Sequence, residues 1–72
     1  MNLVWRDNGI AHHAEGSNGF QYVIFTGWQN TLVKRVPATR RNGKTVVHRQ
    51  GDVTGVAAGR ALAQRWEDEE AA

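Results

Sequence analysis

The sequence predicts an α+β fold, in which an antiparallel β-meander of four to five strands precedes one C-terminal α-helix packed on one face of the sheet. Short segments rich in β-branched and aromatic residues, separated by turns that contain Asn-Gly, indicate the strands. Near the C-terminus the apolar residues instead recur at intervals of three or four, which is the period of a helix. With 72 residues, the chain is expected to form one small domain over residues 1–72.

The first hairpin is predicted around Asn8 and Gly9, between residues 3–6 and residues 10–14. Asn and Gly tolerate the positive φ angles that a tight hairpin turn requires. We therefore expect these two segments to be the first pair of antiparallel strands.

The central strand is predicted at residues 20–26, after a second turn at residues 16–19. This segment is apolar on both of its alternating faces, with Tyr22 and Ile24 on one face and Phe25 on the other. A strand that is apolar on both faces is typical of the middle of a sheet.

Two further strands are predicted at residues 31–36 and 44–49, the first of them after a turn at residues 27–30. Pro37 either ends the first strand or marks a sheet edge, because its nitrogen has no hydrogen to donate. Residues 37–43 are then expected to form a loop.

The helix is predicted over residues 52–69, with Asp52 accepting hydrogen bonds from the free N–H groups of its first turn. Small residues on one side would let the helix lie close to the sheet, with a tryptophan as the far anchor. These residues are Gly55, Gly59, Ala63 and Trp66.

The acidic run from Glu67 to Glu70 lies at the negative end of the helix dipole, which is the unfavourable sign. Residues 67–72 are therefore expected to form a frayed acidic tail. The predicted core consists of the large apolar residues of the strands and the helix. These are Trp5, Tyr22, Ile24, Leu32, Leu62 and Trp66.

The charges are unevenly distributed, although the net charge is only +2. Residues 17–50 contain six lysines and arginines and no acid. Such a one-sign segment attracts partners of opposite charge. The residues are Lys34, Arg35, Arg40, Arg41, Lys44 and Arg49.

These basic residues predict contacts with nucleic acid, mainly with its phosphates, through a hairpin and loop at residues 34–49. Trp28 lies in a predicted turn, where it could stack on a base or anchor a protein contact. Two plainer interpretations stay open. The cations could simply form a solvated strand pair, and Trp28 could fold back over an edge of the core.

Catalysis and metal binding find little support in the residues. The chain has no cysteine, and Ser17 is its only serine. His12 and His13 are neighbours on a strand and should point to opposite faces, so they are not expected to share a metal ion. We expect no enzymatic activity, no cofactor and no metal.

The core positions carry a resemblance. Leu3 and Trp5, then Ala14, Tyr22 and Ile24, then the helix with Ala61, Leu62, Ala63 and Trp66 resemble small uncharacterised proteins of phages and prophages. The resemblance implies a strand meander closed by an Ala-rich helix. It also implies a small accessory protein that acts by binding, often on host machinery. The basic loop around Arg40 and Arg41 departs from that pattern.

The leading hypothesis is thus a non-enzymatic accessory protein that contacts nucleic acid. The alternative is a modulator or inhibitor of an acidic host protein, and the third option is a structural subunit of a phage assembly.

No apolar run approaches the roughly 18 residues of a membrane span. We therefore expect no membrane association and a location in the cytoplasm, that of the host cell for a phage protein. Homodimer formation is a further expectation, because so small a core is marginal.

Overall fold

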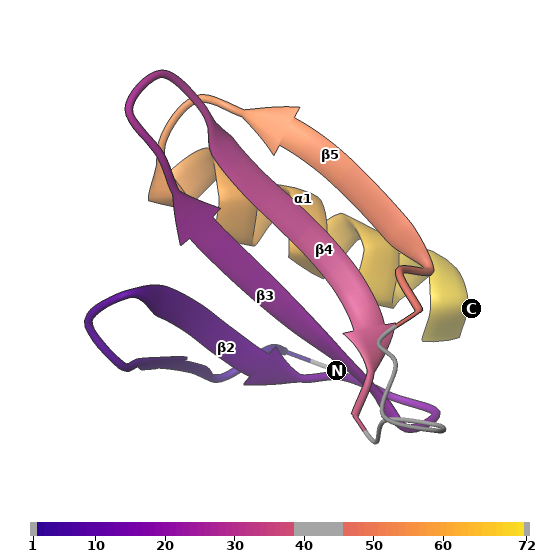
Figure 1. Cartoon of the computed structure of the whole chain (residues 1–72). Coiled ribbons are helices and arrows are strands. Elements are labelled where there is room, and N and C mark those ends of the chain that lie inside the picture. The colour runs from indigo at the N-terminus through magenta and orange to yellow at the C-terminus, as the bar shows by residue number, and fades with distance from the viewer. Residues whose placement is uncertain (1, 39–45, 72) are drawn as a thin grey trace.

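Five strands follow one another along the chain and are succeeded by one helix (Figure 1). The computed structural model describes residues 2–38 and 46–71. Each strand pairs in antiparallel fashion with the next, so the sheet order is β1-β2-β3-β4-β5. This confirms the predicted α+β meander. The elements are β1 (Trp5–Asp7), β2 (Ala11–Glu15), β3 (Phe20–Thr26), β4 (Thr31–Pro37), β5 (Arg49–Val53) and α1 (Val56–Ala71).

The first two turns lie where the sequence predicts them. Gly9, Asn18 and Gly19 have positive φ angles of 88°, 60° and 77°. In the first turn the Asn8 side chain also accepts a hydrogen bond from the Ala11 amide at 2.9 Å. The local chemistry of the turns therefore positions β1, β2 and β3 beside one another.

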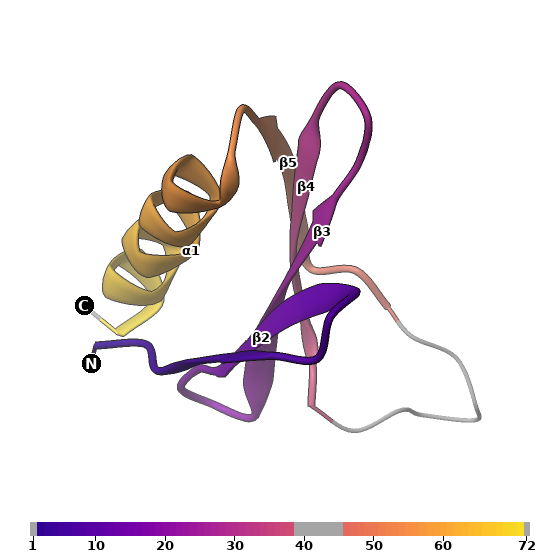
Figure 2. The ribbon, with the colours of Figure 1, turned by 90° about the vertical axis from the view of Figure 1, so that its left-hand side faces the viewer.

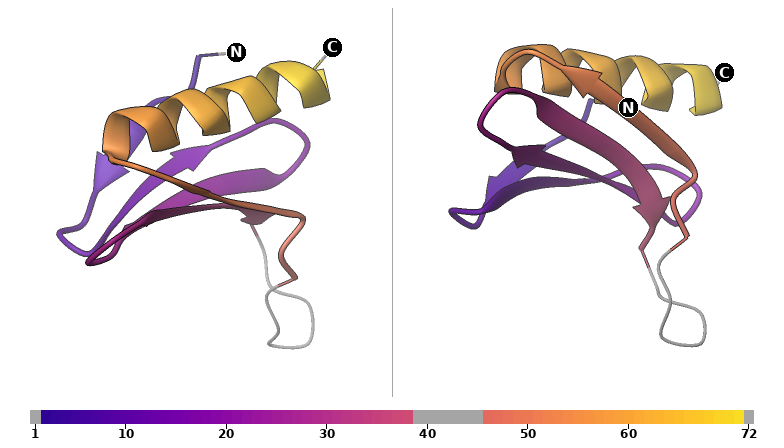
Figure 3. Two further views of the ribbon diagram at one scale, coloured as in Figure 1. Left: turned by 90° about the horizontal axis from the view of Figure 1, so that it is seen from above. Right: turned by 45° about the horizontal axis from the view of Figure 1, so that its top comes forward.

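Helix α1 covers one face of the sheet and lies against β3, β4 and β5 (Figures 2 and 3). The core lies between these two layers. It is formed by Tyr22, Ile24, Val33, Ala63 and Trp66, with Trp5 and Leu62 partly buried at its edge. No described helix or strand covers the opposite face, which we call the uncovered face.

The predicted fifth strand is displaced along the chain. It was expected at residues 44–49, but residues 46–48 are not in a strand and β5 begins at Arg49. The register places Gly51 opposite Val33, beneath the helix. A Cβ atom on Gly51 would lie 3.0 Å from the Leu62 side chain, so a residue without a side chain suits this position.

The helix starts later than predicted because β5 occupies the segment that contains Asp52. Asp52 pairs with Leu32 inside the sheet and does not cap the helix. The chain turns at Gly55, which has a φ of 93° and donates its amide hydrogen to Thr31 Oγ1 at 3.2 Å. Helix α1 then begins at Val56.

Leu32 was predicted to lie in or near the core, but it is only partly buried and lies outside the cluster beneath the helix. The register pairs Val33 with Ile24 on the face beneath the helix, so Leu32 points to the uncovered face beside Phe25. The alternation within β4 was correct, but the sequence does not tell which of its two faces the helix covers.

The predicted fraying from Glu67 onward also differs from the structure. Helix α1 continues to Ala71, and the Glu67 side chain is fully buried. Glu69 and Glu70 both form ion pairs with Arg49 of β5. These partners offset the unfavourable position of the acids at the negative end of the dipole. No described helix is long and apolar enough to cross a membrane.

Candidate functional site

Arg35 was predicted to contact nucleic acid, but its side chain is only 1% exposed. It lies beneath the helix, opposite Arg49 in the register. Its Nε donates to the Tyr22 hydroxyl at 3.0 Å, and its Nη1 donates to His48 Nδ1 at 2.9 Å. The guanidinium also stacks 3.8 Å above the Phe20 ring. Arg35 therefore holds the fold together and is not available to a partner.

Arg35 belongs to a buried polar network that sequence reasoning missed. The Tyr22 hydroxyl donates to Glu67 Oε1 at 3.2 Å. The same oxygen accepts hydrogen bonds from the Ser17 amide at 3.0 Å and from the Ser17 hydroxyl at 3.1 Å. A neutral hydroxyl thus links a buried cation to a buried carboxylate, and joins β3, β4 and α1.

The network shifts the pKa values of its members. Burial raises the pKa of Glu67, but the hydrogen bonds from Ser17 and Tyr22 outweigh burial and hold that pKa below its ordinary value. Burial raises the pKa of Tyr22 above its ordinary value, in spite of the opposing effect of Arg35. The carboxylate therefore stays charged and the phenol stays neutral around pH 7.

Arg49 is also engaged within the molecule. Its Nη1 lies 2.8 Å from Glu69 Oε2, and its Nη2 lies 2.9 Å from Glu70 Oε1. The hydrogen bond to Glu69 raises the pKa of Arg49 above its ordinary value. Arg49 therefore ties β5 to the last turns of α1.

Lys34 lies on the other side of the sheet from Arg35 and Arg49, as the alternation along β4 requires. Its Nζ lies 5.8 Å from the centre of the Phe25 ring. The other predicted basic contacts, Arg40, Arg41 and Lys44, lie outside the described residues. The predicted basic surface is thus divided between the two faces in the part of the chain that the structure describes.

Trp28 lies in the turn between β3 and β4, and its relative exposure is 104%. The Gly27 amide donates to the Asn30 carbonyl at 2.9 Å and closes this turn. The side chain does not fold back over the core, so that interpretation is wrong. A fully solvated indole at the tip of a hairpin is free to meet a partner.

The uncovered face contains a hollow of about 380 Å³. Its floor includes Val23 and Val36, which are buried, and its walls include Phe25 and Val47, each 40% exposed. Lys34 also lines this hollow. The hollow is therefore lined by apolar side chains together with the polar side chains of His13, Gln21 and Lys34.

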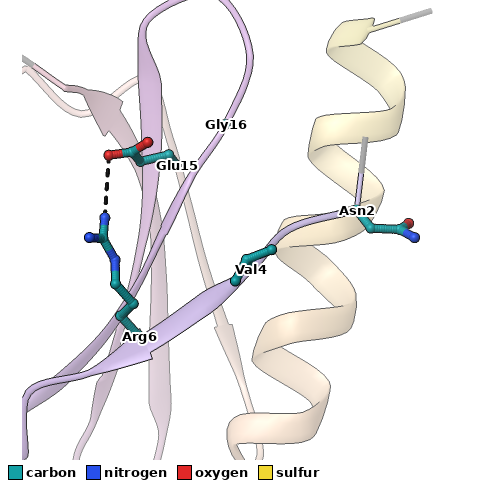
Figure 4. A pocket seen from close by; sticks show the side chains of 5 residues that line it. All are labelled: Asn2, Val4, Arg6, Glu15 and Gly16. Carbon is teal, nitrogen blue, oxygen red and sulfur yellow. Dashed lines mark hydrogen bonds and ion pairs between the residues drawn. The ribbon is translucent and has the colours of Figure 1, made fainter.

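A second hollow of about 510 Å³ lies beside the N-terminal segment (Figure 4). Arg6 and Glu15 extend toward each other in it, with Arg6 Nη2 3.3 Å from Glu15 Oε1. Both side chains are largely exposed and satisfy each other's charge. Because its two charged side chains already pair with each other, this larger hollow is a weaker candidate for ligand binding than the hollow on the uncovered face.

The adjacent histidines lie on opposite faces, as alternation along a strand requires. His12 pairs with Ile24 on the side of the helix, and His13 pairs with Val23 on the uncovered face. Among residues 2–38 and 46–71, no group of three side chains could hold a metal ion.

No family model matches the chain, and the comparisons with curated proteins and with solved structures found no match. The resemblance to phage proteins stays a prediction.

Proposed function

We propose that this protein is a non-catalytic protein-binding module, which contacts its partner with Trp28 and the uncovered face of its sheet. The fully exposed indole at the β3–β4 turn carries the proposal. Tryptophan is enriched among the residues that dominate protein interfaces, because it buries a large rigid surface on binding. The two strands that hold it belong to the centre of the sheet, so the side chain is presented from a firm support.

The alternative of nucleic-acid binding takes second place. Arg35 is buried and Arg49 is paired with two carboxylates, so neither offers free donors to phosphates. One observation favours this alternative. Lys34 and Phe25 lie together on the same uncovered face, and Trp28 could serve as a stacking platform for a base.

The biological setting that fits the proposal is the accessory role implied by the resemblance to phage proteins. A module of this kind would act in the cytoplasm of the host by binding and modulating a host protein. A structural subunit of an assembly would instead associate with further copies of this chain through its unpaired strand edges. Sedimentation of the protein alone at rising concentration separates these two roles.

Site-specific photo-crosslinking tests the proposal. A photoreactive amino acid replaces Trp28 in one variant and Ala58, an exposed residue of the helix, in the matched control. In cells of the source organism or its host, we expect position 28 to capture one discrete protein that position 58 does not capture. The purified partner should then bind the Trp28→Ala variant about 30-fold more weakly, which corresponds to about 2 kcal/mol.

A second measurement addresses the alternative. Fluorescence anisotropy of labelled DNA and RNA is followed at low and at physiological salt. The nucleic-acid hypothesis would replace the proposal under two conditions. The logarithm of the binding constant should fall linearly with the logarithm of the salt concentration, and binding should disappear in an Arg40→Ala, Arg41→Ala double variant. Equal crosslinking at positions 28 and 58 would also contradict the proposal.

A further inference from the structure

We infer that the hollow on the uncovered face receives an acidic segment of a partner protein, with a carboxylate paired to Lys34 and an apolar side chain inserted beside it. The inference rests on the proposed function and specifies the chemistry of the partner. The occupant is an extended peptide segment, because of the charge of the hollow, its shape and its distance from Trp28.

Charge is the first reason. Among residues 2–38 and 46–71, no carboxylate lies within ion-pair distance of Lys34. By contrast, Arg6, Arg49 and Arg65 each have a carboxylate partner. The described lining of the hollow also contains His13 and no acid. An incoming carboxylate would thus meet a lysine without a carboxylate partner and no acid in the described lining, while Glu15 and Asp52 lie on the same face outside that lining.

The positions of the two nitrogen-bearing side chains support the same conclusion. His13, Val23 and Lys34 lie directly opposite one another on β2, β3 and β4. Two strand spacings, about 10 Å, therefore separate the backbones of His13 and Lys34. Their side chains flank the buried Val23, so a carboxylate above Val23 would lie between Lys34 and His13, whose Nε2 is 3.3 Å from Asn8 Nδ2.

Shape is the second reason. The hollow has a volume of about 380 Å³, at the low end of the range for ligand pockets, which is about 300–1,000 Å³. Val36 and Val23 close its floor, while Phe25 and Val47 remain partly exposed around it. Filling it with a large apolar side chain would remove the exposed parts of Phe25 and Val47 from water.

Reach is the third reason. Val23 lies five residues before Trp28, and because the chain turns after Thr26, their backbones are at most about 17 Å apart. A peptide of about six extended residues can therefore contact the hollow and the indole together. A small molecule in the hollow would not reach Trp28. A nucleic-acid strand would find Lys34 as the single lysine or arginine in the described lining, beside the neutral donor Gln21 and His13.

The test uses a library of randomised 12-residue peptides displayed on particles and selected on the intact protein. We expect the selected peptides to place Asp or Glu next to Leu, Ile or Phe. By anisotropy, synthetic copies should bind the Lys34→Glu variant at least about tenfold more weakly. The matched control is Arg60→Glu, which reverses a charge on the helix, far from the hollow, and should leave binding unchanged.

A charge exchange completes the test. A selected peptide whose acid is replaced by Lys should bind the Lys34→Glu variant better than it binds the original protein. Circular dichroism of each variant establishes that the fold is kept. Selected peptides that depend on Trp28 but carry no acid, or that ignore Lys34→Glu, would overturn this inference and leave the proposed function standing. Selection that yields no peptide sensitive to Trp28→Ala or Lys34→Glu would count against both.

Discussion

Glu67 illustrates how the same residue type takes different roles at neighbouring positions. Its Oε1 accepts three hydrogen bonds, from the Ser17 amide, the Ser17 hydroxyl and the Tyr22 hydroxyl. Asp68, the next residue, is exposed and accepts from Gln64 at 2.9 Å on the surface of the helix. Burial therefore makes one of these acids essential to the fold and leaves the other replaceable.

Replacing Glu67 with Ala should lower the free energy of unfolding by about 3 kcal/mol, because three donors lose their acceptor. Glu67→Gln should cost about 1 kcal/mol, since the amide oxygen still accepts hydrogen bonds. Asp68→Ala is the matched control and should stay within about 0.5 kcal/mol. Urea denaturation at pH 7 measures all three. Equal effects of Glu67→Ala and Asp68→Ala would show that the network adds nothing.

The sequence contains only a partial signal for this network. Glu67 falls four residues after Ala63 and eight after Gly59, on the stripe that faces the sheet. Three other acids follow it directly, so the run resembles a solvated helix end. Its partner Ser17 lies 50 residues away in the chain, and only the folded sheet brings the two together.

At the scale of the elements, α1 approaches the sheet closely at Gly59. A Cβ atom there would lie 3.2 Å from Val33 Cγ2 and 3.3 Å from Ile24 Cδ1. Val33 and Ile24 are fully buried and have little room to move. The glycine therefore sets how closely the helix approaches the sheet.

Gly59→Leu should destabilise the protein by about 2–3 kcal/mol, because the added side chain overfills the space above Val33 and Ile24. Ala58→Leu changes the exposed neighbouring position and should have little effect. Thermal unfolding followed by circular dichroism distinguishes the two variants. A Gly59→Leu variant as stable as Ala58→Leu would contradict the close approach.

The sequence predicts elements well where local chemistry determines them. Asn8-Gly9 and the spacing of Gly59, Ala63 and Trp66 correctly indicate the first hairpin and the helix face. The fifth strand was placed wrongly, because Arg49–Val53 has a single large apolar residue and no strand pattern of its own. Its position follows from pairing with β4, a long-range contact that local propensity does not contain.

At the scale of the whole molecule, the sheet separates two tasks. The face beneath α1 holds the core and the buried charges of Arg35 and Glu67. The uncovered face holds the hollow lined in part by Lys34, and Trp28 lies in the β3–β4 turn. Adjacent residues 34 and 35 thus have opposite roles. The alternation of side chains along a strand predicts that residues 34 and 35 point to opposite faces of the sheet. Only the position of the helix decides which of them is buried.

The pH dependence of stability follows from the buried network. The pKa of Glu67 is lower in the folded protein than its ordinary value of 4.5, so its stabilisation is complete above that value. It is lost as the pH falls through the folded pKa. Glu69 shifts in the same direction, chiefly through its hydrogen bond from Arg49. The pKa of Tyr22 is raised above 10.0, so its contribution is complete below pH 10 and is lost as the pH rises through the folded value.

We therefore expect a plateau of stability between about pH 5 and pH 10, with a decline on each side. Urea midpoints measured across this range and beyond it provide the test. Glu67→Gln should weaken the decline of stability at acid pH and keep the decline at alkaline pH, because the amide does not titrate. Tyr22→Phe should do the opposite, since it removes the phenol that must stay protonated between Arg35 and Glu67. A decline at acid pH that is unchanged in Glu67→Gln would assign the acid sensitivity to Glu69 and its partner Arg49, at the junction of β5 and α1.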